Sequence, residues 1–160
     1  MICFIPTKSR PKTNTYQPFE SAGIPFLHFV EPQEYDLYNV PNKVNIGSND
    51  KGISFVRNFM LDYAKDNNHK WVIFCDDDVS EFGLSVAGKC SRTSAAIWFD
   101  VLNKATHLPF ELYGINYRQH AWREKKEYSI NSKFVEVCVL ANIENIRWKY
   151  RLEFDLIRLS

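Results

Sequence analysis

Residues 70–78 have the sequence Lys-Trp-Val-Ile-Phe-Cys-Asp-Asp-Asp, in which a short apolar run leads directly into three carboxylates. An apolar run of this length is typical of a parallel strand that is buried on both faces of a sheet. Ligands of open α/β sheets bind at the carboxyl ends of such strands. Three adjacent carboxylates repel one another unless a metal ion or a basic side chain offsets their charge. The stretch therefore predicts an α/β fold with a divalent metal at a strand end, where it would hold a substrate that carries phosphate.

Short apolar runs and helical patterns alternate along the rest of the chain. The apolar runs predict strands, and apolar residues at helical spacing predict helices. The expected strands cover residues 2–5, 25–30, 43–46, 71–75, 112–117 and 133–141, and the expected helices cover residues 14–22, 52–67 and 93–105. Residues 31–41 predict a turn or an irregular helix, residues 79–92 a glycine-containing loop, and residues 143–160 suit helical and extended pieces equally. This order predicts one α/β domain over residues 1–160, with a Rossmann-like mixed sheet flanked by helices.

The bulk composition is that of a globular protein. Apolar residues make up 45% of the 160 residues and charged residues 24%, which excludes disordered and fibrous classes. The four cysteines are widely spaced and form no Cys-x-x-Cys pair, so we expect a reducing compartment. No basic signal sequence and no apolar stretch long enough to span a membrane is present, so we expect a cytoplasmic protein without a membrane partner.

The aspartate cluster has the chemistry of a metal site. Asp76 and Asp78 are separated by one residue, so their side chains could reach the same side of a strand end, with Asp77 on the other side unless the chain turns there. Carboxylate oxygens suit Mg²⁺ or Mn²⁺, which take further oxygens from substrate phosphates and water. The alternative is an acidic strand end that flanks a solvated loop.

Two basic segments could lie near the aspartates. In the helix expected over residues 52–67, Ser54, Arg57 and Asn58 share one polar face, and Asn49 or Asp50 is placed to cap the helix. Arginine presents a planar set of donors that suits phosphate, and a helix N-terminus favours an anion. The alternative is a surface arginine on an amphipathic helix.

The loop that follows the first expected strand is the second basic segment. It contains Thr7, Lys8, Ser9 and Arg10, and it should lie at the same carboxyl edge of the sheet. Two cations and two hydroxyls in one loop suit phosphate binding, although lysine and arginine are also common in loops without such a role.

These three segments, in this order, resemble those of the GT-A glycosyltransferases, and most closely those of the phage TET-associated glycosyltransferases. The resemblance is carried by Ile-Pro-Thr-Lys-Ser-Arg-Pro at residues 5–11, Gly-Ile-Ser-Phe-Val-Arg-Asn at residues 52–58 and Phe-Cys-Asp-Asp-Asp at residues 74–78. It covers residues 1–83 well and the remainder loosely. It implies a GT-A fold with a DxD motif and the transfer of a sugar from a nucleotide donor, here UDP-linked, to hydroxymethylated pyrimidines such as 5-hydroxymethylcytosine in bacteriophage DNA.

The resemblance also implies a role for each matching residue. It assigns residues 1–83 to the nucleotide sugar and residues 84–160 to the acceptor. The donor side would be formed by Thr7, Lys8, Arg10, Ser54, Arg57, Asp76 and Asp77. Asp78, together with Asp76, would bind Mn²⁺ or Mg²⁺, and the metal would stabilise the departing diphosphate.

The second half of the chain contains an excess of basic residues mixed with aromatic residues. Residues 116–160 hold 9 Lys/Arg against 6 Asp/Glu, whereas residues 1–115 hold 11 against 13. Cations and aromatic rings bind phosphodiesters and stack bases, and enzymes that act on a base commonly flip it from the duplex. We therefore expect a DNA acceptor site, whose candidate residues are Tyr117, Arg118, His120, Trp122 and Arg123. A further cluster covers residues 147–151, and the alternative for residues 117–126 is an exposed loop with buried tryptophan anchors.

An inverting transferase needs a carboxylate that deprotonates the acceptor hydroxyl. Glu153 and Asp155 lie where the resembled family has an acidic motif, and they are the candidates for this base. An ion pair with Arg151 or Arg158 at helical spacing is an equally good interpretation of the two acids. His28 and His120 are lesser candidates, since histidines are more often packed or exposed than catalytic.

Two other functions are compatible with the same residues. One is a GT-A-like module that binds nucleic acid without catalysis. The other is a phosphohydrolase of the haloacid-dehalogenase type, because Asp76-Asp77-Asp78 also resembles the Asp-x-Asp segment of those enzymes. That segment normally lies near the N-terminus, which disfavours this second alternative.

Overall fold

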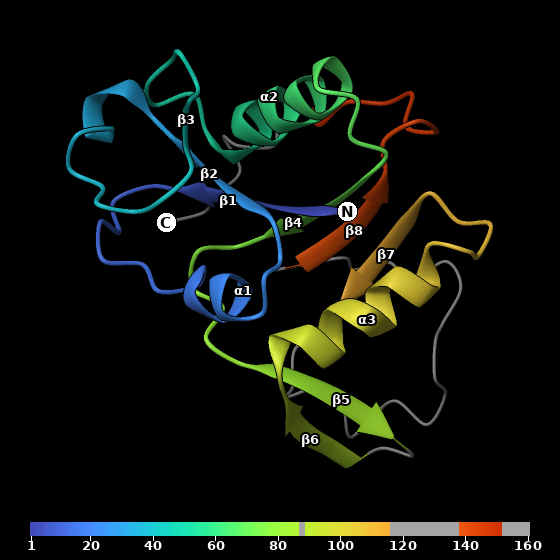
Figure 1. Cartoon of the computed structure of the whole chain (residues 1–160). Coiled ribbons are helices and arrows are strands. Elements are labelled where there is room, and N and C mark those ends of the chain that lie inside the picture. Colours follow the sequence, from blue (N-terminus) through green and yellow to red (C-terminus); the bar gives the residue numbers. More distant parts are fainter. Residues whose placement is uncertain (87–88, 116–137, 152–160) are drawn as a thin grey trace.

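The structure is a computed structural model that describes residues 1–86, 89–115 and 138–151. Its centre is a six-stranded mixed sheet in the order β3-β2-β1-β4-β8-β7 (Figure 1). Strands β1 to β4 are parallel, and β8 runs antiparallel to both β4 and β7. The bounds are Ile2–Thr7 for β1, Phe26–Val30 for β2, Lys43–Asn45 for β3, Trp71–Cys75 for β4, Leu112–Ile115 for β7 and Cys138–Asn142 for β8. The predicted fold class, a mixed α/β sheet flanked by helices, is confirmed.

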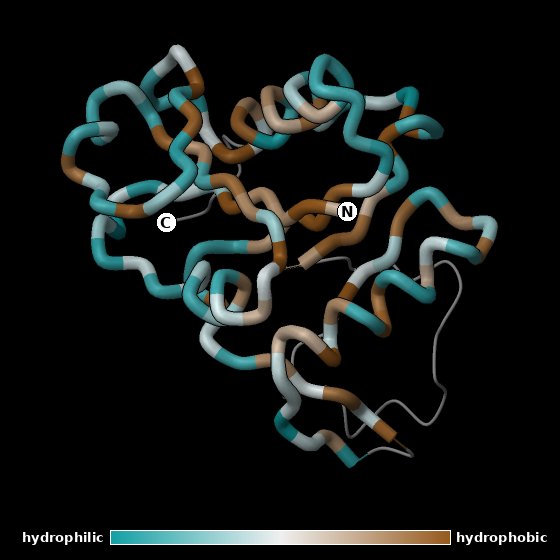
Figure 2. The backbone as a smooth tube through the Cα atoms, in the orientation of Figure 1, coloured by the Kyte–Doolittle hydropathy of each residue, from teal (hydrophilic) through white to brown (hydrophobic). Residues whose placement is uncertain are grey.

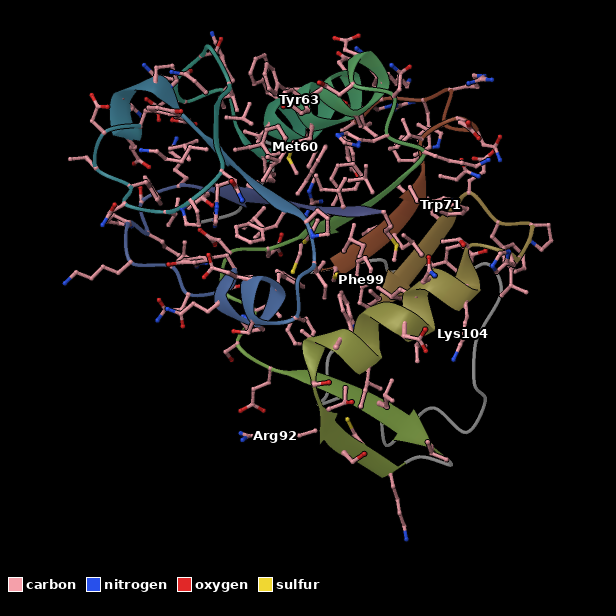
Figure 3. All side chains as sticks on the ribbon, viewed as in Figure 1. Met60, Tyr63, Trp71, Arg92, Phe99 and Lys104 are labelled. Atoms are coloured by element: carbon pink, nitrogen blue, oxygen red, sulfur yellow. The ribbon has the colours of Figure 1, made fainter. Side chains whose placement is uncertain are left out.

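Helices cover both faces of the sheet. The longest, α2 (Ile53–Asp66), lies on one face, and α1 (Gln17–Ser21) and α3 (Ala95–Ala105) lie on the other (Figure 1). A short 3₁₀ helix, η1 (Pro32–Glu34), follows β2, where the sequence predicts a turn or an irregular helix. In Figure 3 the Met60 side chain lies between α2 and the sheet, whereas Lys104 and Arg92 point into solvent.

The alternation of side chains along the strands divides the core into two layers. Phe4 and Phe74 pack under α2, and Cys3 and Ile73 pack under α1 and α3. This is the expected period of two in a sheet that is buried on both faces. Figure 2 shows the result: the central strands are largely hydrophobic, and the hydrophilic residues lie mainly in the loops and on the outer sides of the helices.

A hairpin below α3 differs from the sequence prediction of a loop. Strands β5 (Phe82–Val86) and β6 (Lys89–Thr93) pair antiparallel as a separate two-stranded sheet. Phe82 anchors the hairpin, because its ring centroid lies 4.6 Å from that of Trp98 on α3. Gly83 leaves room for the Cys90 side chain, since a Cβ at this position would lie 2.8 Å from the sulfur of Cys90. The prediction of a loop was wrong because Trp98 of α3 and Phe19 of α1 supply the apolar surface that the hairpin lacks by itself.

The start of α2 also differs from the prediction. Its N-cap is Gly52, and neither Asn49 nor Asp50 caps it with a side chain. Both side chains turn toward η1 instead: Asn49 accepts a hydrogen bond from the backbone of Gln33, and Asp50 accepts hydrogen bonds from Lys8 and the Gln33 amide. The predicted cap was wrong because a long-range partner competes for both side chains.

Three of the four cysteines are buried, and Cys90 is partly exposed. Cys3, Cys75 and Cys138 are free thiols that lie together on neighbouring strands, and burial raises the pKa of Cys3 and of Cys138. Within the described ranges, none of the helices is both long and apolar enough to cross a membrane.

Candidate functional site

The carboxyl ends of three parallel neighbours, β2, β1 and β4, meet at one edge of the sheet. Each strand is followed there by an ionisable residue or a basic loop: Glu31 after β2, Lys8 after β1 and Asp76 after β4. The sequence predicts this convergence for Lys8 and Asp76, and the structure brings both to the same edge. The candidate site consists of this edge and the N-terminal half of α2.

Arg10 neutralises two of the three aspartates. Its Nη1 lies 2.5 Å from Oδ1 of Asp77 and 3.2 Å from Oδ2 of Asp78. The two aspartates differ in burial, since the Asp77 side chain is 9% exposed and that of Asp78 is 59% exposed. Burial raises the pKa of Asp77, and the charge of Arg10 opposes that rise. Asp77 is thus held inward by Arg10, and Asp78 remains open to a ligand.

Asp76 points to a different cation. Its Oδ1 lies 3.4 Å from Nη2 of Arg57 on α2, and the two side chains are 35% and 24% exposed. Burial raises the pKa of Asp76, with a further contribution from the nearby charge of Asp78, and Arg57 opposes the shift. The distance is longer than that of a tight charge-assisted hydrogen bond, so Arg57 keeps capacity for another anion.

The chain turns immediately after Asp76. The hydroxyl of Thr13 donates a hydrogen bond of 2.6 Å to the backbone oxygen of Asp77 and holds this turn. The sequence predicts Asp76 and Asp78 on one side of the strand end, with Asp77 on the other, only if the chain stays extended there. In the folded chain Asp77 and Asp78 share Arg10, whereas Asp76 lies on the α2 side.

The first loop is held in place by side chains of the η1 region. The backbone N–H of Ser9 donates to Glu34 at 2.8 Å, and the backbone N–H of Arg10 donates to the hydroxyl of Tyr38 at 2.7 Å. Burial raises the pKa of Tyr38 to about 12, so this hydroxyl stays neutral at physiological pH. The loop that carries Lys8 and Arg10 is thereby fixed at the sheet edge.

Glu31 is a functional candidate that the sequence analysis missed. It is 3% exposed, and it accepts hydrogen bonds from Nζ of Lys8 at 3.0 Å, the Gln33 amide at 2.9 Å and the backbone of Asp50 at 3.1 Å. Lys8 also bonds Asp50 at 2.5 Å; this contact raises the pKa of Lys8 and lowers that of Asp50. Its position in the sequence could have indicated this role, because Glu31 directly follows β2 as Asp76 directly follows β4.

Three further candidates from the sequence, Thr7, Ser54 and His28, lie within the described residues and are buried. Thr7 is buried and donates to the backbone oxygen of Ile5 at 3.3 Å, and Ser54 is buried in the first turn of α2. His28 is fully buried, with Nδ1 3.0 Å from the backbone oxygen of Pro41, and burial lowers its pKa. His28 is therefore a core histidine.

The segment that follows β8 returns to the site. Asn58 on α2 donates from Nδ2 to the backbone oxygen of Tyr150 at 2.9 Å and accepts from the backbone N–H of Tyr150 at 2.7 Å. The ring centroid of Tyr150 lies 5.6 Å from the guanidinium carbon of Arg57. Sequence reasoning placed residues 147–151 with the acceptor, but the structure puts Tyr150 beside the Arg57–Asp76 pair.

The donor atoms at the site suit a hard divalent cation only in part. No group of three or more His, Cys, Asp or Glu side chains within residues 1–86, 89–115 and 138–151 is arranged to hold a metal. Asp77 is engaged by Arg10, which leaves the more exposed Asp76 and Asp78. Their oxygens are of the type that Mg²⁺ and Mn²⁺ prefer, and both ions commonly complete their coordination with substrate phosphates and water. A bound diphosphate would have to complete such a site.

The remaining candidates from the sequence lie outside the described residues. They are the acceptor candidates Tyr117, Arg118, His120, Trp122 and Arg123 and the candidate bases Glu153 and Asp155.

A family model described as TET-Associated Glycosyltransferase matches residues 1–156 of the chain. Comparison with curated proteins and with solved structures gives no match.

Proposed function

Because the chain belongs to the TET-associated glycosyltransferase family, and is therefore a glycosyltransferase, we propose that it moves a sugar from a UDP-linked donor to 5-hydroxymethylcytosine in DNA. A nucleotide-sugar donor and an acceptor follow from the family. The identity of the nucleotide, the need for a divalent cation and the DNA acceptor are parts of the proposal.

One observation carries the donor part of this proposal. Two arginines from different elements, Arg10 from the first loop and Arg57 from α2, contact the three aspartates at the carboxyl edge of the parallel strands. Planar guanidinium donors suit the diphosphate of a nucleotide, and α/β sheets bind such ligands at this edge. We assign Thr7, Lys8, Arg10, Ser54, Arg57, Asp76 and Asp77 to the donor side, with Asp78 and Asp76 as the ligands of Mn²⁺ or Mg²⁺.

The chain's own side chains would act on the leaving group. When the bond from the sugar to the diphosphate breaks, negative charge grows on the diphosphate oxygens. Arg10 and Arg57 would stabilise that charge by charge-assisted hydrogen bonds. A divalent cation bound at Asp78 would supply Lewis-acid stabilisation of the same oxygens.

The acceptor part is supported by the family and by charge. Residues 116–160 carry the basic excess, and they include the candidate acceptor residues Tyr117, Arg118, His120, Trp122 and Arg123. We propose Glu153 or Asp155 as the base that deprotonates the hydroxymethyl group in an inverting reaction. In this proposal residues 84–160 bind the acceptor, and residues 1–83 bind the nucleotide sugar.

The proposal is tested by sugar transfer to duplex DNA that contains 5-hydroxymethylcytosine. The protein is incubated with Mn²⁺ and a mixture of UDP-hexoses and UDP-N-acetylhexosamines, and the DNA is analysed by mass spectrometry. We expect the DNA to gain the mass of one sugar with the wild type, but not with Asp78→Ala or with unmodified DNA. DNA binding without a gain in mass would favour a non-catalytic binding module. Failure of UDP to bind in calorimetry with Mn²⁺ would contradict the donor assignment.

The phosphohydrolase alternative has a separate readout. Asp76 follows the fourth strand of the chain, rather than the N-terminal strand at which the haloacid-dehalogenase segment normally lies. Release of phosphate from simple phosphomonoesters, abolished by Asp76→Asn, would support that alternative against the transferase.

A further inference from the structure

The segment after β8 packs along α2 at several points. Ile143 and Ile146 are 2% and 0% exposed in the core layer under α2, and Nζ of Lys149 lies 2.7 Å from Oδ2 of Asp62. The two hydrogen bonds between the Asn58 amide and the backbone of Tyr150 complete this attachment. Both bonds involve the same residue, so a shift of the segment by one position would break both of them. The position of Tyr150 along α2 is therefore determined.

This register places an aromatic ring against a cation of the donor site. The Tyr150 ring lies 5.6 Å from the guanidinium carbon of Arg57, and Arg57 also contacts Asp76 at 3.4 Å. The ring of Trp148 meets that of Tyr150 edge to face, with centroids 5.4 Å apart. Arg57 is thus held between an aromatic side chain from the segment that follows β8 and a carboxylate from the end of β4.

A guanidinium that packs against an aromatic ring keeps donors for an anion. Arginine has five N–H groups, and the contacts of Arg57 with the ring and with Asp76 leave several of them for hydrogen bonds to phosphate. When a ligand draws Asp76 away, the ring still orients Arg57. Burial raises the pKa of Tyr150, and Arg57 opposes that rise by its charge and by a hydrogen bond to the hydroxyl, so both the ring and the neutral hydroxyl of Tyr150 lie against Arg57.

We infer that Tyr150 is a positioning residue that orients Arg57 for the diphosphate of the nucleotide-sugar donor, with Asn58 setting the register of Tyr150. This inference rests on the proposed function, because it assumes that Arg57 binds the donor diphosphate. It adds the segment that follows β8 to the donor site.

The test is a double-mutant cycle on UDP binding, measured by calorimetry with Mn²⁺ on the full chain. Tyr150→Leu removes the aromatic face but keeps an apolar side chain, and we expect it to weaken UDP binding about fivefold, the size of one cation–π contact. Tyr150→Phe keeps the ring but removes the hydroxyl that also contacts Arg57, so it should weaken UDP binding less than Tyr150→Leu does. In the Arg57→Ala background, Tyr150→Leu should cause no further loss, because the residue acts only through Arg57.

Asp62→Asn is the matched control, since it removes the ion pair of the same segment with α2 but leaves Arg57 untouched. It should bind UDP as the wild type does, and thermal melting of every variant reports whether it folds. Equal losses for Tyr150→Leu and Asp62→Asn, or additive losses for Tyr150→Leu and Arg57→Ala, would overturn the inference and leave the proposed function standing. A wild type that binds no UDP would overturn both.

Discussion

Nη1 of Arg10 lies 2.5 Å from Oδ1 of Asp77, and this contact joins the loop after β1 to the turn after β4. The two residues are 67 positions apart in the sequence. Asp78 shares the same guanidinium at 3.2 Å, so one cation serves both carboxylates. The pair therefore sets how much negative charge the turn presents to a ligand.

We expect Arg10→Ala to weaken UDP binding about tenfold in the presence of Mn²⁺, the effect of losing one charge-assisted hydrogen bond. Arg10→Lys should recover part of the loss, because it keeps the charge but not the planar donors. Calorimetry measures both. Arg92→Ala, which removes an exposed ion pair between β6 and Glu81, is the control and should not change UDP affinity. An unchanged affinity for Arg10→Ala would remove Arg10 from the donor site.

Asp76→Asn should raise the thermal midpoint of the free protein at pH 7. Folding raises the pKa of Asp76, mainly by burial. The contribution of this carboxyl to the free energy of unfolding is therefore fully present below its pKa in the unfolded chain, and it is lost as the pH rises through its pKa in the folded chain. Ionised Asp76 thus costs stability at pH 7, and asparagine avoids that cost. The advantage should disappear below about pH 4, where the wild-type carboxyl is also protonated.

Asp100→Asn is a control for this pH experiment, because it removes only an exposed carboxylate that pairs with Lys104 on α3. It should be neutral or slightly destabilising at pH 7. A lower midpoint for Asp76→Asn than for the wild type at pH 7 would show that the Arg57 contact outweighs the burial of Asp76.

We expect Glu31→Ala to lower the free energy of unfolding by about 2 kcal/mol, because three donors lose a buried acceptor. Glu31→Gln keeps the shape of the side chain and should cost less. Urea denaturation measures both changes. Lys70→Ala, which removes an exposed ion pair with Glu144, should change the free energy of unfolding by less than about 0.5 kcal/mol. Equal effects of the glutamate and lysine substitutions would mean that the Glu31 network does not support the site.

Gly52→Ala should destabilise the protein by about 2 kcal/mol, since the φ of 82° and ψ of 168° at Gly52 form a conformation that is almost restricted to glycine. Gly23→Ala is the control. Its φ of 67° lies in the ordinary left-handed region, and its Cβ would meet no atom within 4 Å, so about 1 kcal/mol is expected. Urea denaturation measures the loss of stability in both variants. UDP affinity should fall more for Gly52→Ala than for Gly23→Ala, because Gly52 is the N-cap of the helix that carries Arg57. Equal costs would mean that the start of α2 can relax.

Several parts of the fold could be predicted because they depend on neighbours in the sequence. The strand Trp71–Cys75 and the helix Ile53–Asp66 have apolar residues at the periods of their own secondary structure. The β5–β6 hairpin could not be predicted in the same way. Its main anchor, Phe82, packs on Trp98 of α3 and thus depends on a partner outside the hairpin.

The sequence alone determined that three carboxylates end a buried strand and that basic residues follow β1 and lie on α2, because strand and helix periods are local properties of the chain. Which of these side chains meet depends on how the chain folds. Arg10 takes Asp77 and Asp78, Arg57 takes Asp76, and Tyr150 reaches Arg57 through Asn58, which lies 92 positions away in the sequence. Such contacts depend on the turn after β4 and on the path of the chain after β8, and no local period specifies either of them.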